Sequence, residues 1–128
     1  MGRREEGDIA IGQLERDLWA AVPAEKTFEK RLAKIDGMFH RAAEPWGRAG
    51  DDRVLSGMII TAAAVVDDAI REEISGIRDD HILTPAEKQD ALLSAGRMAE
   101  AVAWLPDGTK SSIKLELAFA HFDISGIK

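Results

Sequence analysis

The stretch DDRVLSGMIITAAAVVDD, residues 51–68, decides the fold that the sequence predicts. Its central thirteen residues, 54–66, carry no charge and lie between two acidic pairs. A bilayer-spanning helix needs about twenty apolar residues, so this run predicts a buried helix of a core rather than a membrane span. Apolar positions recur at helical spacing on two faces: Ile59, Ala63, Val66, Ile70, Ile74 and Ile77, and Met58, Ala62, Val65 and Ala69. We therefore expect a central helix from about residue 51 to residue 75, with Gly76 weakening its end.

Two amphipathic helices are predicted before this stretch. The first is expected to begin after Asp8 as N-cap, and the second to open at Pro23 and to stop before Pro45. Spacing of three and four residues marks their buried faces. These faces are Ile11, Leu14, Leu18, Ala21 and Val22 in the first helix, and Phe28, Leu32, Ile35, Phe39, Ala42 and Trp46 in the second.

A fourth helix is predicted after the central one by the sequence TPAE at residues 84–87. Thr84 as N-cap, Pro85 in the first turn and Glu87 three residues after the cap form a capping box. The buried face of this helix is expected at Ala91, Ala95, Met98, Val102 and Leu105.

The C-terminal segment after the turn PDGT, residues 106–109, has two interpretations. The alternation in IKLELAF is typical of a strand, and a β-hairpin with residues 101–105 would follow. Apolar residues at Ile113, Leu117, Ala120 and Ile124 instead fit a fifth helix that opens at Ser111 or Ser112. An isolated hairpin is only marginally stable, which favours the helix. The fold class is therefore an all-α compact bundle of four to five helices, with a C-terminal β-hairpin as the alternative.

The composition of the chain argues against several kinds of partner and chemistry. With 128 residues, 45% of them hydrophobic and 31% charged, the chain fits one helical domain, residues 1–128. A net charge of −6 argues against nucleic acid and anionic membranes as partners, because such binding relies on Lys and Arg. Cysteine is absent, which removes disulfides and thiolate chemistry. The first residues contain no signal-peptide pattern, so a cytoplasmic location is expected.

Acidic residues offer one candidate metal site. Asp68 and Glu72 share a helix face, and Glu87 and Asp90 add an ExxD pair on the next helix, so the four could hold Mg²⁺. This ExxD pair resembles that of the all-α nucleoside-triphosphate pyrophosphatases, whose preceding helix carries EExxE. Here Glu72 and Glu73 are followed by no third glutamate, since residues 74–76 are Ile, Ser and Gly. The preferred interpretation is that these carboxylates form a solvated helix face.

The interpretation as a solvated helix face does not fit Asp67. Asp67 falls within the apolar arc of the central helix, where it requires a partner, and Arg71 follows one turn later. We expect a buried structural ion pair between them.

No catalytic or cofactor-binding residue is predicted. The three histidines lie on separate segments without metal-ligand spacing, and His121 is expected in the core between two phenylalanines. The serines stand in neither a G-x-S-x-G nor an S-x-x-K motif, and no glycine-rich phosphate loop occurs.

The predicted function is that of a non-catalytic interaction or assembly protein that binds itself or another protein, most simply as a homo-oligomer. Two faces of the central and fourth helices are apolar, which is more than a small monomer needs. Leu93, Arg97 and Trp104 form a second row on the fourth helix and are the candidate interface. A Mg²⁺-dependent nucleotide hydrolase and an acidic inhibitor that imitates nucleic acid remain as alternatives.

Overall fold

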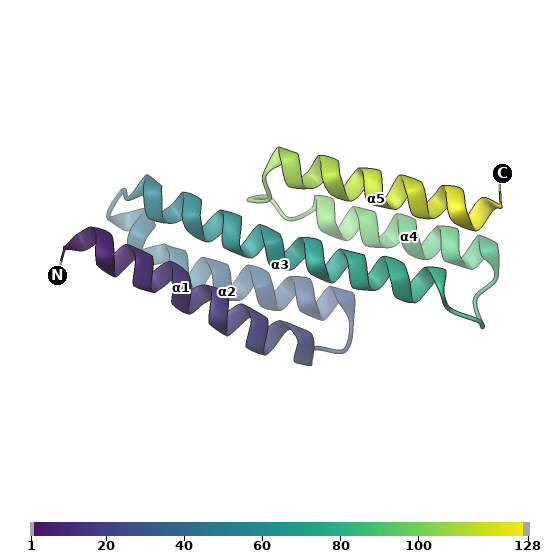
Figure 1. Cartoon of the computed structure of the whole chain (residues 1–128), viewed down its shortest axis with the longest axis horizontal. Coiled ribbons are helices and arrows are strands. Elements are labelled where there is room, and N and C mark those ends of the chain that lie inside the picture. Colours follow the sequence, from purple (N-terminus) through teal and green to yellow (C-terminus); the bar gives the residue numbers. More distant parts are fainter. Residues whose placement is uncertain (1, 127–128) are drawn as a thin grey trace. The chain divides into compact units, whose positions relative to one another are not determined.

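The computed structural model describes residues 2–126, which fold into helices joined by short turns. Their order is α1 (Arg3–Ala21), the 3-10 turn η1 (Val22–Ala24), α2 (Phe28–Arg48), α3 (Asp52–Arg78), α4 (Pro85–Glu100) and α5 (Asp107–Ser125) (Figure 1). The all-α class is thus confirmed, with five α-helices in the described residues. The β-hairpin alternative is wrong, because residues 2–126 contain no strand and residues 107–125 are helical.

The backbone contacts divide the chain into two units, residues 1–66 and 67–128. The boundary falls inside α3, so the first part of this helix belongs to the first unit and the second part to the second. Each unit has apolar residues buried along its helices. The single domain over residues 1–128 stays a prediction.

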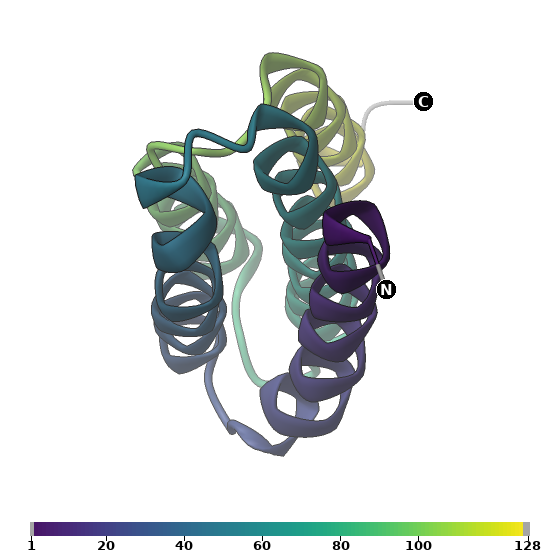
Figure 2. The same ribbon diagram turned by 90° about the vertical axis from the view of Figure 1, so that its left-hand side faces the viewer.

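The first unit consists of α1, η1, α2 and the first turns of α3, which Figure 2 shows end-on. The predicted stripe of α2 is largely confirmed, because Phe28, Leu32, Ile35 and Phe39 are buried, whereas Ala43 is buried in place of Ala42. An ion pair of 2.9 Å between Asp8 Oδ1 and Arg53 Nη1 links α1 to α3. A buried apolar face and exposed charges thus account for the local fold.

Three predicted boundaries in this unit are wrong. Asp8 is not an N-cap, since α1 already begins at Arg3. Pro23 lies in the 3-10 turn, and α2 begins after Thr27, whose hydroxyl accepts the N–H of Lys30 at 3.2 Å. Pro45 does not end α2, which continues to Arg48. The proline lies in the exposed last turn of α2, and the chain reverses at Gly50, which has the left-handed φ of 68°.

The second unit consists of the end of α3 together with α4 and α5, and the last two lie side by side in opposite directions (Figure 1). The capping box is confirmed: Thr84 Oγ1 accepts the N–H of Glu87 at 3.1 Å, and Glu87 Oε1 accepts the N–H of Thr84 at 3.0 Å. Leu92, Ala95 and Ala99 are the buried residues of α4. Because α4 ends at Glu100, Trp104 lies in the following turn rather than on the predicted helix row.

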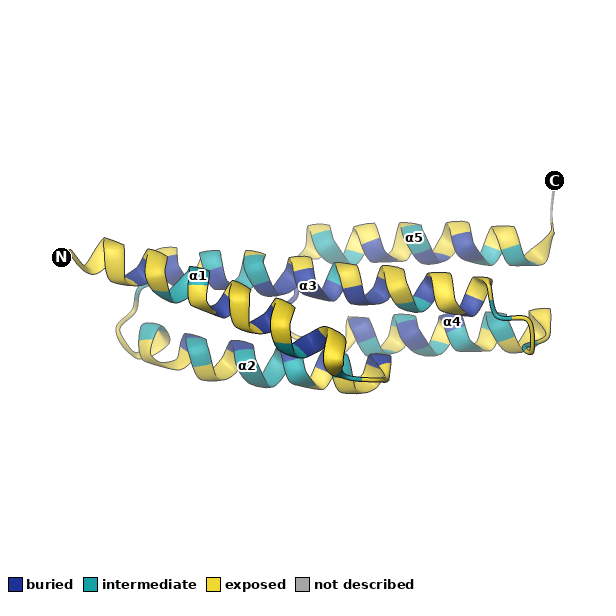
Figure 3. Ribbon diagram, turned by 60° about the horizontal axis from the view of Figure 1, so that its bottom comes forward, coloured by how far each residue is buried: buried dark blue, intermediate teal, exposed yellow. Residues whose placement is uncertain are grey.

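The helical state of α5 follows from its buried face. Ile113, Leu117 and Ala120 are buried and Ile124 is partly buried, as the helical interpretation required. The helix begins at Asp107, four residues before Ser111 and five before Ser112, the two predicted starts, and Pro106 is its N-cap. Buried, partly buried and exposed segments alternate along α5 in Figure 3, as expected of a helix with one buried face.

Candidate interaction surface

Helix α5 carries a second apolar stripe, opposite its buried one. Leu115, Phe119 and Phe122 are 58%, 62% and 53% exposed, and they follow one another at spacings of four and three residues. That spacing places their side chains on one face of the helix. We call these three residues the outer stripe.

The outer stripe differs from the other exposed apolar residues of the chain. The others are Ile9, Trp19, Ile60, Ile82 and Leu93, which belong to different elements or, in α1, lie ten residues apart. Single exposed apolar side chains are normal on a protein surface. Three large ones in register on one helix face form a patch that water solvates poorly, which is typical of an interaction surface.

A groove between α4 and α5 adjoins the outer stripe. Its volume is about 320 Å³, and its apolar lining includes Leu92, Leu93, Leu105, Ile113 and Leu117. A Cβ placed on Gly96, another lining residue, would come within 3.0 Å of Leu117 Cδ1. The two helices therefore pack closely beneath the groove.

Ala118 connects the groove to the outer stripe. It lines the groove and is itself exposed. It also follows Leu115 by three residues and precedes Phe122 by four, so it belongs to the same side of α5. The groove and the stripe thus form one continuous apolar surface.

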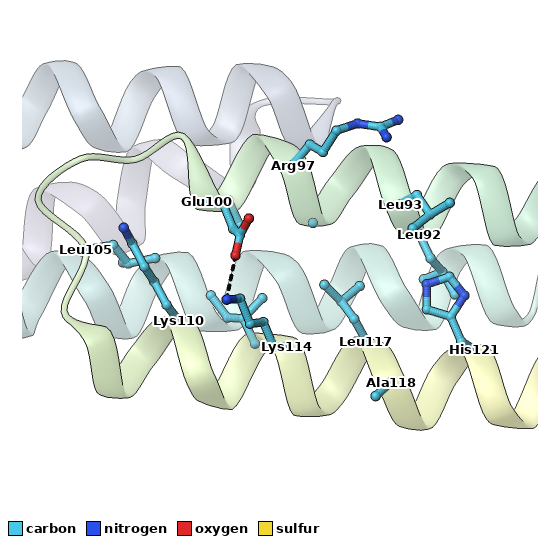
Figure 4. Close-up of a pocket in the computed structure, with 13 residues that line it drawn as sticks. Leu92, Leu93, Arg97, Glu100, Leu105, Lys110, Lys114, Leu117, Ala118 and His121 are labelled. Atoms are coloured by element: carbon cyan, nitrogen blue, oxygen red, sulfur yellow. Dashed lines mark ion pairs between the residues drawn. The ribbon is translucent and has the colours of Figure 1, made fainter.

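Charged side chains border the groove (Figure 4). Glu100 Oε1 and Lys114 Nζ lie 2.9 Å apart and join α4 to α5. This ion pair lowers the pKa of the Glu100 carboxyl and raises the pKa of the Lys114 ammonium, chiefly through the hydrogen bond between them. Arg97, also on the rim, points away from α5 in Figure 4. The border is polar and the floor apolar, as in many protein interfaces.

His121 lies at the other end of the groove and is held by Gln89 of α4. The Gln89 side-chain oxygen contacts Nδ1 of His121, and the Gln89 amide donates to the His121 carbonyl oxygen at 3.2 Å. The predicted core histidine is thus partly buried and bonded. Its sequence neighbours Phe119 and Phe122 are exposed.

The predicted interface residues lie partly on this surface. Leu93 is 50% exposed and lines the groove with Arg97. Trp104 is partly buried in the turn after α4. The outer stripe itself was missed by sequence reasoning, which assigned only one apolar face to α5. The signal was present in the four-and-three spacing of Leu115, Phe119 and Phe122.

The candidate metal ligands Asp68, Glu72, Glu87 and Asp90 are all exposed. The Glu87 carboxylate is already bonded to the backbone N–H of Thr84, which lowers the pKa of Glu87. Within residues 2–126, no group of three or more histidine, aspartate and glutamate side chains is arranged to hold a metal ion. The Mg²⁺ site therefore stays a prediction without geometric support.

The expected ion pair of Asp67 and Arg71 is present, with 3.1 Å between Asp67 Oδ2 and Arg71 Nη2. It is not buried, because 62% of the Arg71 side chain and 24% of the Asp67 side chain are exposed. Glu116 of α5 joins it, with Oε1 only 2.6 Å from Arg71 Nε. The two carboxylates raise the pKa of Arg71, mainly through the hydrogen bond to Glu116. Arg71 thus connects α3 to α5 through its ion pair with Glu116.

Comparisons with known proteins assign neither a family nor a function to the chain. No family model, no curated protein and no solved structure matches the chain. Among the described helices, none combines the length and the apolar character needed to cross a membrane.

Proposed function

We propose that this protein is a non-catalytic helical assembly module that associates with a second copy of itself through α5. The observation that supports this function is the outer stripe, which exposes Leu115, Phe119 and Phe122 on one helix face. Removing such a patch from water is favourable by roughly 25 cal/mol per Å² of apolar surface. The chain would therefore gain from any partner that covers it.

A second copy is the simplest partner, because two-fold homodimers are the commonest oligomers. The area of this surface determines how strongly two copies are expected to associate. A phenylalanine side chain buries about 150–250 Å² in all, so two that are already half covered add roughly 200 Å². A stable interface needs about 800 Å² from each partner. The groove and Leu93 must therefore take part, and we propose a dimer that forms reversibly with protein concentration.

Light scattering at several protein concentrations tests this function. The monomer mass is 14.0 kDa, and we expect the wild-type mass to rise above it as concentration increases. The double variant Phe119→Gln, Phe122→Gln should stay at the monomer mass. Ile60→Gln is the matched control, because Ile60 is 69% exposed but lies on α3 in the first unit. A wild-type mass of one chain at every concentration, or an equal loss in the control, would contradict the proposal.

A further inference from the structure

The groove between α4 and α5 has an excess of positive charge at one end. Figure 4 shows Lys110 and Lys114 extending from α5 toward the α4 side, whereas Arg97 points away from α5. Glu100 pairs with Lys114 at 2.9 Å, and the Lys110 side chain has no ion pair among the described residues. Of the side chains that line this end, two ammonium groups therefore face one carboxylate. In a protein with a net charge of −6, such a local positive excess indicates an anionic ligand.

The remainder of the groove is apolar. Leu92, Ile113 and Leu117 line it and are buried within the chain. His121, at the opposite end, is already bonded to Gln89. One end of the groove thus suits an anionic group, and the rest suits an apolar body.

The volume of the groove, about 320 Å³, fits a small molecule better than a helix. Small-molecule pockets measure about 300–1,000 Å³, whereas one turn of a helix 10 Å wide occupies about 420 Å³. Lys114 and His121 lie seven residues apart on α5, which corresponds to about 10.5 Å along the helix. An extended alkyl chain advances about 1.25 Å per carbon, so about eight carbons span this distance.

We propose that this groove binds a small amphipathic anion, a monocarboxylate with an apolar body of about eight carbons. Its carboxylate lies between the ammonium groups of Lys110 and Lys114, and its apolar body lies along Ile113 and Leu117. One negative charge matches the excess at this end, which a phosphate dianion would exceed. Binding removes apolar surface from water and gives Lys110 a counter-ion.

Octanoate is the probe, titrated at neutral pH below the concentration at which it forms micelles and followed by amide NMR spectroscopy. We expect saturable shifts at groove residues such as Leu93, Gly96 and Leu117, and none along α1 and α2. Hexanoate should bind more weakly, by about fourfold for each methylene removed. Octylammonium, which has the same body and the opposite charge, should bind more weakly by about tenfold or more.

Lys110→Met removes the positive charge and keeps an extended apolar side chain. It should weaken the binding of octanoate about tenfold and leave the binding of neutral octanol unchanged, a difference that a merely structural role would not produce. Lys30→Met is the matched control, because Lys30 is exposed on α2 in the first unit. This control should bind octanoate as the wild type does.

Three results would overturn the anion site: equal affinity for octanoate and octylammonium, an unchanged affinity for octanoate in Lys110→Met, or shifts that spread without saturation to α1 and α2. The groove also belongs to the surface proposed for self-association, so a bound anion and a second copy compete for it. The titration is therefore made at a protein concentration where light scattering gives the mass of one chain. Its result is then independent of self-association, and either proposal can fail without the other.

Discussion

Gly7 of α1 and Val54 of α3 approach so closely that a Cβ on Gly7 would lie 2.5 Å from Val54 Cγ2. Both residues are buried, and Val54 is completely so. A β-branched valine has one strongly preferred rotamer in a helix and cannot turn its methyl group away. The absent side chain at Gly7 is therefore a condition for α1 to pack on α3.

Gly7→Ala should accordingly destabilise the protein by about 1–3 kcal/mol, the usual cost of overpacking. Gly12→Ala is the matched control on the same helix, because its nearest neighbour is Arg16 Nη1 at 3.6 Å, an ordinary contact. There the gain in helix propensity should stabilise by up to about 1 kcal/mol. Denaturant unfolding of both variants measures the difference. Equal stability of the two would show that α1 can move away from α3 without loss.

The capping box predicts how the protein responds to acid. Glu87 accepts the backbone N–H of Thr84, and Asp80 accepts those of Ile82 and Leu83 at 2.7 and 2.9 Å, so the pKa of each carboxyl is lowered. A lowered pKa in the folded state adds stability above the unfolded pKa, and this stability is lost as the pH falls through the folded value. The free energy of unfolding should thus decline below about pH 4.

Glu87→Gln isolates the contribution of Glu87 to this decline. Glutamine can still accept the Thr84 N–H in a capping box but cannot be protonated, so the acid dependence should flatten while stability at pH 7 changes little. Asp90→Asn, on the exposed side of the same helix, is the control and should leave the acid dependence unchanged. The measurement is denaturant unfolding between pH 2 and pH 7. If the free energy of unfolding of Glu87→Gln falls with pH as steeply as that of the wild type, Glu87 does not cause the decline.

The ion pairs of Arg71 predict that the second unit loses stability when Arg71 is replaced. One oxygen of Asp67 and one of Glu116 are buried without a hydrogen-bond partner among the described residues, so both carboxylates depend on Arg71 for their other oxygen. Arg71→Gln should therefore destabilise more than Arg78→Gln, whose ion pairs are longer, at 3.7 and 3.9 Å. The difference should shrink at high salt, because the Arg71 side chain is largely exposed. Thermal unfolding at low and high ionic strength tests both statements, and equal losses would contradict them.

The sequence predicted most of the fold because its apolar residues recur at helical spacing wherever a helix is buried. Boundaries were less predictable, as Pro45 and Gly76 show. Both were expected to end or weaken a helix, yet α2 continues to Arg48 and α3 to Arg78. Both residues are exposed, and a Cβ on Gly76 would meet no atom within 4 Å. Local propensity predicts only a tendency there, and the neighbouring turns decide the end.

The candidate surface was predicted only in part, for a different reason. Leu93 and Arg97 were identified from their spacing on one helix, and they do lie at the groove. The groove itself depends on the distance between α4 and α5, which the pattern of one helix does not contain. The outer stripe was hidden because the alternation of apolar and polar residues in IKLELAF also fits a strand. Only the helical state of α5 shows that Phe119 and Phe122 point away from Leu117.

Self-association through the outer stripe also predicts how thermal stability depends on concentration. A dimer that dissociates on unfolding is stabilised by mass action, so the Tm of the wild type should rise with protein concentration. In the Phe119→Gln, Phe122→Gln variant the Tm should be independent of concentration. Because these side chains are more than half exposed in one chain, the variant should match the wild type at the lowest concentrations.

Leu93→Gln provides an intermediate case, because Leu93 is half exposed on the groove side of the same surface. Its Tm should rise with concentration less steeply than that of the wild type, whereas Ile60→Gln should follow the wild type. Calorimetry over a hundredfold range of concentration separates these slopes. A wild-type Tm that stays constant over that range would contradict self-association. A double variant that unfolds earlier than the wild type at every concentration would show that Phe119 and Phe122 stabilise the single chain instead of an interface.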